Sequence, residues 1–188
     1  MQATCTTSSG MMTANPVVPE GMNPAWLEQA CFGSNLPEQV EQHLYLAGLN
    51  YQNDQIAESH LFQAQALAPG HAAVLIALYR FYFYKGRLLD ALEVAQRCLI
   101  KAARDNGLNE DWRRVQPGDA AFGSYDAVLP RFYLFTLKAC GYLQMRLGRL
   151  EESRVVLNRM LELDPTDKLS ASVLLKVLYR HGREDEDE

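Results

Sequence analysis

A 34-residue pattern that occurs three times constrains the fold of this chain more than any other feature. One copy begins at Glu38, the next begins at Ala72, and a third begins at Leu134. Apolar side chains recur within the copies at the spacing of amphipathic helices, and no stretch shows the convincing alternation of a strand. A repeat of this length has room for two helices joined by a turn.

Small residues and helix-ending residues fall at matching positions of the copies. Position 20 is small in all three: Ala57, Ala91 and Ser153. Position 15 is Gly86 in the second copy and Gly148 in the third, and position 32 is Pro69 in the first and Pro165 in the third. Small residues let two antiparallel helices approach closely, glycine ends the first helix, and proline cannot continue the second. We therefore expect each copy to be a helical hairpin.

This pattern resembles the tetratricopeptide repeat, a 34-residue helix–turn–helix unit. The third copy matches best, over LKACGYLQMRLGRLEESRVVLNRMLELDP, from Leu137 to Pro165. The first two copies depart from the pattern at position 8, where Tyr45 and Tyr79 stand in place of the small residue that Gly141 provides. The resemblance implies an all-α fold: a tetratricopeptide-like helical-hairpin solenoid of about three repeats, with a C-terminal capping helix and an inserted loop.

The repeats divide the chain into three parts. Residues 1–22 are rich in Ser, Thr, Gly and Pro, and we expect them to be disordered. Residues 23–183 are expected to form the helical domain, with repeats at about 38–71, 72–103 and 134–167, an insertion at about 104–132 and a capping helix at about 167–181. A short helix is expected at Asp111–Val115 within the insertion, and Gly182 is expected to end the capping helix. Residues 184–188 form an acidic tail.

Charge is distributed unevenly along the chain. Residues 1–79 hold six acidic residues and no Lys or Arg, whereas residues 80–183 hold all 18 basic residues and 12 acidic ones. The basic middle part favours a protein partner with an acidic surface. It lacks the motifs of nucleic-acid-binding domains, and no apolar stretch reaches the roughly 18 residues that a membrane span needs. The start of the chain has no basic and apolar leader and the four cysteines are scattered, so we expect a cytoplasmic protein.

The sequence carries no group of residues typical of an enzyme. It contains no GxSxG, no HExxH and no glycine-rich phosphate loop. None of the histidines has a Cys or carboxylate partner at metal-ligand spacing: His43, His60, His71 and His181. Cys98 and Cys140 occupy repeat positions that small residues normally fill, which favours burial. We therefore expect no enzymatic activity, no cofactor and no metal site.

The resemblance to tetratricopeptide proteins also implies where a partner would bind. In that family the first helices of successive repeats line a concave groove, which here would change from neutral to basic and aromatic along the chain. The candidate partner-binding residues are Arg80, Phe83, Tyr84, Lys138, Tyr142, Met145 and Arg146, together with Trp112, Arg113 and Arg114 of the inserted loop. Arg, aromatic residues and Met are enriched in the cores of protein interfaces.

A second resemblance concerns the segment SYDAVLPRFYLFTLKACGYLQMRLGRLEESRVVLNRMLELDP, from Ser124 to Pro165. It is similar to small tetratricopeptide proteins associated with nitrogenase in nitrogen-fixing bacteria, the group that includes nitrogenase-associated factor T. This resemblance implies a non-catalytic accessory protein that binds the molybdenum–iron component of nitrogenase during assembly, protection or repair.

Two other functions remain open from the sequence. A chaperone of the three-repeat kind that serves type III secretion has a similar size and repeat number, and it would bind an extended segment of an exported client. A metal or redox protein would use Cys98, Cys140 and a histidine.

Overall fold

The computed structural model describes residues 36–184, with side chains through Arg180, and within this range it contains seven α-helices and no strand. The helices are α2 (Glu38–Leu49), α3 (Asp54–Leu67), α4 (Ala72–Tyr84), α5 (Leu88–Asp105), α6 (Val128–Arg146), α7 (Leu150–Leu163) and α8 (Ala171–Glu184). This confirms the expected all-α fold. The expectations for residues 1–22, for the chain up to Asn35 and for the acidic tail beyond Glu184 lie outside the described residues.

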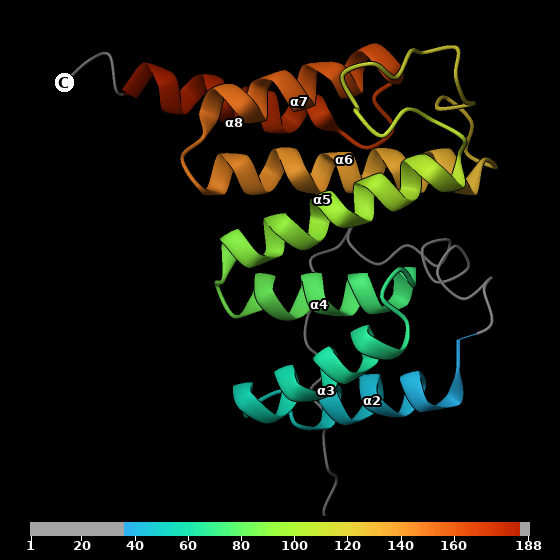
Figure 1. The fold of residues 1–188 in the computed structure, drawn as a ribbon. Helices are drawn as coiled ribbons and strands as arrows, with labels where there is room; N and C mark the ends of the chain where they lie inside the picture. Colours follow the sequence, from blue (N-terminus) through green and yellow to red (C-terminus); the bar gives the residue numbers. More distant parts are fainter. Residues whose placement is uncertain (1–35, 185–188) are drawn as a thin grey trace, which may run out of the picture.

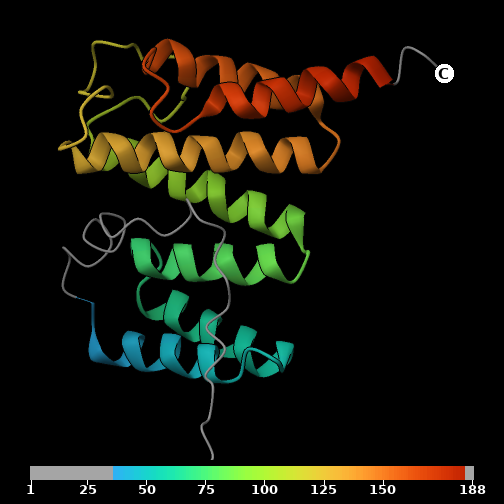
Figure 2. The same ribbon diagram turned by 180° about the vertical axis from the view of Figure 1, so that it is seen from behind.

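The helices pair into three hairpins, α2–α3, α4–α5 and α6–α7, which stack in chain order. Figures 1 and 2 show this stack from opposite sides, with α8 packed against α7 at one end. Neighbouring hairpins meet where α3 contacts α4 and where α5 contacts α6. Each hairpin therefore buries its apolar faces against the next, as in a helical-repeat array.

The 34-residue register is visible in the geometry of the hairpins. The second helix of every hairpin begins at repeat position 17, at Asp54, Leu88 and Leu150. The small residues at position 20, which are Ala57, Ala91 and Ser153, are all 0% exposed. At position 15, Gly86 has φ of 73° and Gly148 has φ of 75°, in the left-handed region that favours glycine after a helix. Equivalent positions of the repeat therefore have the same structural role in successive hairpins.

Helices α6 and α7 approach each other closely in the third hairpin. The Ser153 hydroxyl on α7 donates a hydrogen bond of 2.7 Å to the Gly141 carbonyl on α6. A Cβ atom on Gly141 would lie 3.1 Å from side-chain atoms of both Leu157 and Val156. In the first hairpin the residue at the position of Gly141 is Tyr45, whose side chain is 67% exposed and points out of this contact.

The insertion is shorter than the sequence indicated, and its expected helix is absent. Helix α5 continues to Asp105, because Ala103 replaces the proline that ends the second helix elsewhere. Helix α6 begins at Val128 rather than near residue 134, and Pro130 is tolerated there because the first turn of a helix leaves its N–H groups unpaired. Residues 106–127 connect the two helices, and Asp111–Arg114 is a turn in which the Arg114 N–H donates to the Asp111 carbonyl.

The capping helix also differs at both ends from its expected range of 167–181. It begins at Ala171, because the Asp167 carboxylate accepts hydrogen bonds from the backbone N–H groups of Ala171 and Ser172 and so caps the first turn. Gly182 does not end it, and the helix continues to Glu184. No helix of residues 36–184 is long and apolar enough to cross a membrane.

The close contact at Ser153 generates a stability prediction. Ser153→Leu inserts bulk between α6 and α7 and should lower the free energy of unfolding by roughly 1–3 kcal/mol, measured by thermal or urea unfolding. Ser153→Ala is the matched control, because alanine stands at this position in the other two hairpins. It loses only the hydrogen bond to Gly141 and should cost about 1 kcal/mol or less. Equal stability of the leucine variant and the wild type would contradict this register.

Candidate protein-binding surface

The first helices of the second and third hairpins carry positive charge and no negative charge. Helix α4 contains Arg80 and no acidic residue, and α6 contains Arg131, Lys138 and Arg146 and no acidic residue. The second helices differ, since α3, α5 and α7 all contain acidic side chains. Net positive charge therefore lies on α4 and α6, whereas the basic side chains of α5 and α7 are offset by acidic side chains on the same helices.

Aromatic side chains connect the C-terminal ends of α4 and α6. The Phe83 ring on α4 lies 6.1 Å from the Tyr142 ring on α6, measured between centroids, and Tyr84 meets Phe83 edge-on at 5.4 Å. Tyr79 stacks on Phe83 at 5.8 Å from the preceding turn of α4. The Arg146 guanidinium donates a 3.0 Å hydrogen bond to the Tyr142 hydroxyl. This network joins Phe83 and Tyr142, which belong to different hairpins and are 59 residues apart in the chain.

We define the α4–α6 patch as Arg80, Phe83, Tyr84, Tyr142 and Arg146. Arg80 and Arg146 are exposed, Tyr84 is 42% exposed, and Phe83 and Tyr142 are half-buried. Arg80 lies one turn before Tyr84, so both side chains share a face of α4. Rigid aromatic rings flanked by exposed guanidinium groups suit the recognition of a carboxylate-rich protein surface. Five of the ten residues predicted from the sequence thus lie together.

Two other residues that were predicted to bind a partner, Lys138 and Met145, make contacts within the domain instead. The Lys138 ammonium donates a hydrogen bond to the Leu169 carbonyl in the connection between α7 and α8. Burial lowers the pKa of Lys138, and the Asp167 carboxylate opposes this shift only in part. Met145 is half-buried and packs against the hydrophobic core. Both side chains therefore stabilise the third hairpin and its cap.

Trp112, Arg113 and Arg114 form a separate surface. They lie in the insertion that enters α6 at Val128, whereas the patch lies near the other end of α6 at Arg146 (Figure 1). Trp112 is half-buried against the core, with the Arg113 guanidinium 4.5 Å from its ring centroid. Arg113 and Arg114 are exposed, within 4 Å of the Asp111 carboxylate. The groove residues and the loop residues predicted from the sequence therefore lie on two separate surfaces.

The insertion is held to the helices by buried apolar anchors and one arginine. Leu108, Val115 and Phe122 are all buried, and the Phe122 ring lies 5.8 Å from the ring of Tyr133 on α6. The Arg159 guanidinium on α7 donates hydrogen bonds to the carbonyls of Val115 and Arg113. The segment is therefore part of the packed domain, which its glycine and proline content did not reveal.

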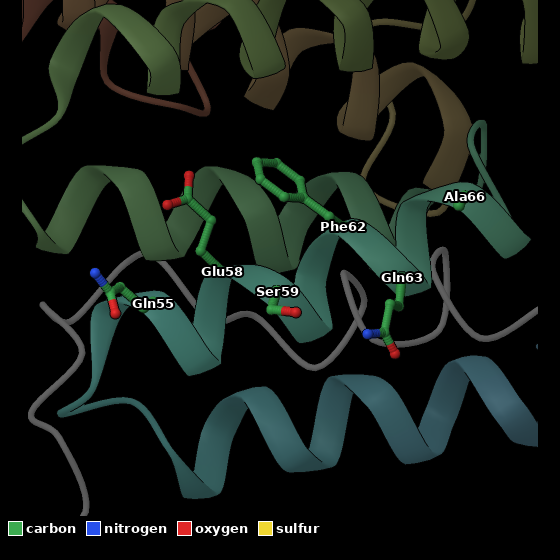
Figure 3. A pocket seen from close by; sticks show the side chains of 6 residues that line it. All are labelled: Gln55, Glu58, Ser59, Phe62, Gln63 and Ala66. Carbon is green, nitrogen blue, oxygen red and sulfur yellow. The ribbon is translucent and has the colours of Figure 1, made fainter.

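A hollow of about 500 Å³ lies along one face of α3. Among the described residues its lining comes from α3 alone: Gln55, Glu58, Ser59, Phe62, Gln63 and Ala66 (Figure 3). Glu58 is already engaged, because its carboxylate accepts a 3.0 Å hydrogen bond from the Tyr82 hydroxyl and a 2.8 Å one from Arg87. The remaining amide, hydroxyl and apolar groups give this hollow no acid–base pair or nucleophile.

The two cysteines of the described residues are placed for packing. Cys98 on α5 and Cys140 on α6 are both buried, and burial raises the pKa of the Cys140 thiol to about 12. A thiol with so high a pKa stays protonated at neutral pH and is a poor nucleophile or metal ligand. Within the part of the chain that the structure describes, no three His, Cys, Asp or Glu side chains are grouped to hold a metal ion.

One pair of side chains was missed by the sequence analysis. His43 on α2 and His60 on α3 lie on different helices, yet their Nδ1 atoms lie 3.2 Å apart. The helical hairpin brings them together across 17 residues. His43 at repeat position 6 and His60 at repeat position 23 lie on the two helices of one hairpin, and this placement in the register is the signal that could have identified the pair.

The anchoring of the insertion by Arg159 can be tested. Arg159→Met keeps the bulk of the side chain but leaves the Val115 carbonyl without its donor, so amides of residues 106–127 should exchange hydrogen about tenfold faster. Arg154→Met is the matched control on the same helix, because Arg154 is exposed and pairs with Glu151 one turn away. Identical exchange of the insertion in both variants would show that Arg159 does not hold it.

Comparison with known proteins places the chain in a family. No protein-family model matches it, and no solved structure matches it. A protein of Azotobacter chroococcum mcd 1, described as an uncharacterized 19.8 kDa protein in the nifW 5' region, is 41% identical over 129 residues. The match spans 68% of this chain and 72% of that relative. At this identity and over this length, the chain belongs to the same protein family as the 19.8 kDa Azotobacter protein.

Proposed function

We propose that this chain is a tetratricopeptide-like, non-catalytic accessory protein of nitrogen fixation, which binds a protein partner through the α4–α6 patch. The nitrogen-fixation context is supported by the relative in the nifW 5' region and by the resemblance of residues 124–165 to nitrogenase-associated proteins. The repeat assignment is supported by the shared register of three hairpins.

The observation that carries the proposal is the combination of charge and aromatic surface on the first helices. Helices α4 and α6 bear basic and no acidic side chains, and their aromatic residues meet at the Phe83–Tyr142 contact. Interfaces obtain most of their binding energy from a few aromatic and arginine side chains. Complementary charge adds specificity and speeds association.

The partner that fits best is a folded protein with an acidic surface, and we propose the molybdenum–iron protein of nitrogenase. Exposed Arg80 and Arg146 would pair with surface carboxylates, while Tyr84 and Phe83 would fill the adjoining apolar contact. The role is that of an assembly, protection or repair factor.

A binding measurement with two charge-matched double variants tests the proposal. Purified full-length chain is titrated against purified molybdenum–iron protein at low salt and again near 0.15 M salt. Arg80→Glu with Arg146→Glu should weaken binding by at least about tenfold, because it places carboxylates against an acidic surface. Arg113→Glu with Arg114→Glu changes charge equally at the other end of α6, and it should leave affinity within about threefold.

Three outcomes would overturn the proposal. Absence of binding at low salt would exclude the molybdenum–iron protein as the partner. A loss of affinity in the Arg113→Glu, Arg114→Glu variant alone would show that the interface lies on the insertion. Tight binding of extended, unfolded client segments, with no binding to the folded protein, would favour a chaperone of the type III secretion kind.

A further inference from the structure

The two histidines of the first hairpin form an arrangement that helix packing does not require. His43 and His60 are half-buried between α2 and α3, with ring centroids 5.4 Å apart and ring planes inclined by 32°. Their Nδ1 atoms are separated by 3.2 Å. Two neutral imidazoles at this distance share one N–H donor, and two protonated ones would repel each other.

The other hairpins show what these positions need for packing alone. Counted in the repeat register, His43 stands at position 6 and His60 at position 23. The residues at those positions are Ala77 and Val94 in the second hairpin and Ala139 and Val156 in the third. Both valines are buried, at 4% and 5% exposure. Small aliphatic side chains therefore suffice to join the two helices, so the imidazole pair is an addition specific to the first hairpin.

The separation of the two nitrogen atoms matches that of two ligands on one metal ion. Imidazole nitrogen binds zinc at about 2.0–2.1 Å. At bond angles between those of square-planar and tetrahedral coordination, two such atoms lie about 2.9–3.4 Å apart. We propose that His43 and His60 form a two-histidine site for a late first-row divalent cation such as Zn²⁺, bound through both Nδ1 atoms. The histidine that carries its N–H on Nδ1 would bind as the Nε2–H tautomer, so the metal ion replaces the shared proton without a net release of protons from the neutral pair.

The site would be open rather than enclosed. The described residues bring no third His, Cys, Asp or Glu side chain to the pair, so the remaining coordination positions would be filled by water or by an oxygen ligand from solution. The ion would connect α2 to α3 and so stabilise the folded first hairpin. This inference does not depend on the proposed function, because the site lies on α2–α3 and the α4–α6 patch on other helices.

Zinc titration of the full-length chain tests the inference. The variant is His43→Ala with His60→Val, which gives the first hairpin the residues that the other two hairpins carry. It should fold and lose one zinc-binding event seen in the wild type by calorimetry. Zinc in about 100-fold excess over its Kd should raise the wild-type melting temperature by roughly 5–10 °C, and it should not raise that of the variant.

His71→Asn is the matched control. It removes an imidazole elsewhere and keeps a side-chain acceptor at the start of α4, where the His71 Nδ1 accepts from the Ala73 N–H at 3.2 Å. This variant should bind zinc and shift in melting temperature as the wild type does. Equal zinc binding by the wild type and the double variant, or no binding by either, would overturn the site and leave the pair as a hydrogen bond between helices.

Discussion

The structure depends on how closely the two helices of each hairpin approach at repeat position 20. A side chain larger than Ala or Ser at that point would separate the helices and expose the apolar residues on either side. In the third hairpin the approach is close enough for the Ser153 hydroxyl to reach the Gly141 carbonyl. The same spacing lets successive hairpins stack in one register, and this register decides which residues of the first helices lie side by side.

The α4–α6 patch is a consequence of that stacking. Phe83 at repeat position 12 and Tyr142 at repeat position 9 meet because the first helices of the second and third hairpins come together near their C-terminal ends. The 22 residues between α5 and α6 do not disturb this geometry, since Leu108, Val115 and Phe122 fold back onto the helices. A long insertion is thus accommodated at one end of α6, while the other end keeps the arrangement of a regular repeat.

The helices and their turns could be predicted from the sequence because each depends on local residues. Gly86 and Gly148 adopt the positive φ that follows a helix, and the small residues at position 20 are buried in all three hairpins. The roles of Lys138 and Trp112 could not be predicted, because each depends on a segment distant in the chain. Lys138 contacts the connection before α8, and Trp112 lies where the insertion packs on the core. The His43–His60 pair could not be predicted from spacing within one helix, because the two residues are 17 positions apart and meet only when the first hairpin folds.

Comparison between repeats separates structural from functional residues when each position has a counterpart. Positions that stay small or aliphatic in all three hairpins, such as position 20, serve helix packing. Where one hairpin departs, as His43 and His60 do from alanine and valine, packing gives no reason for the change. The same comparison applies to the patch, since position 9 is Leu46 in the first hairpin but Arg80 and Tyr142 in the second and third. The first hairpin therefore differs in chemistry from the two that carry the basic surface, which is why the proposed metal site and the proposed protein interface fall on different hairpins.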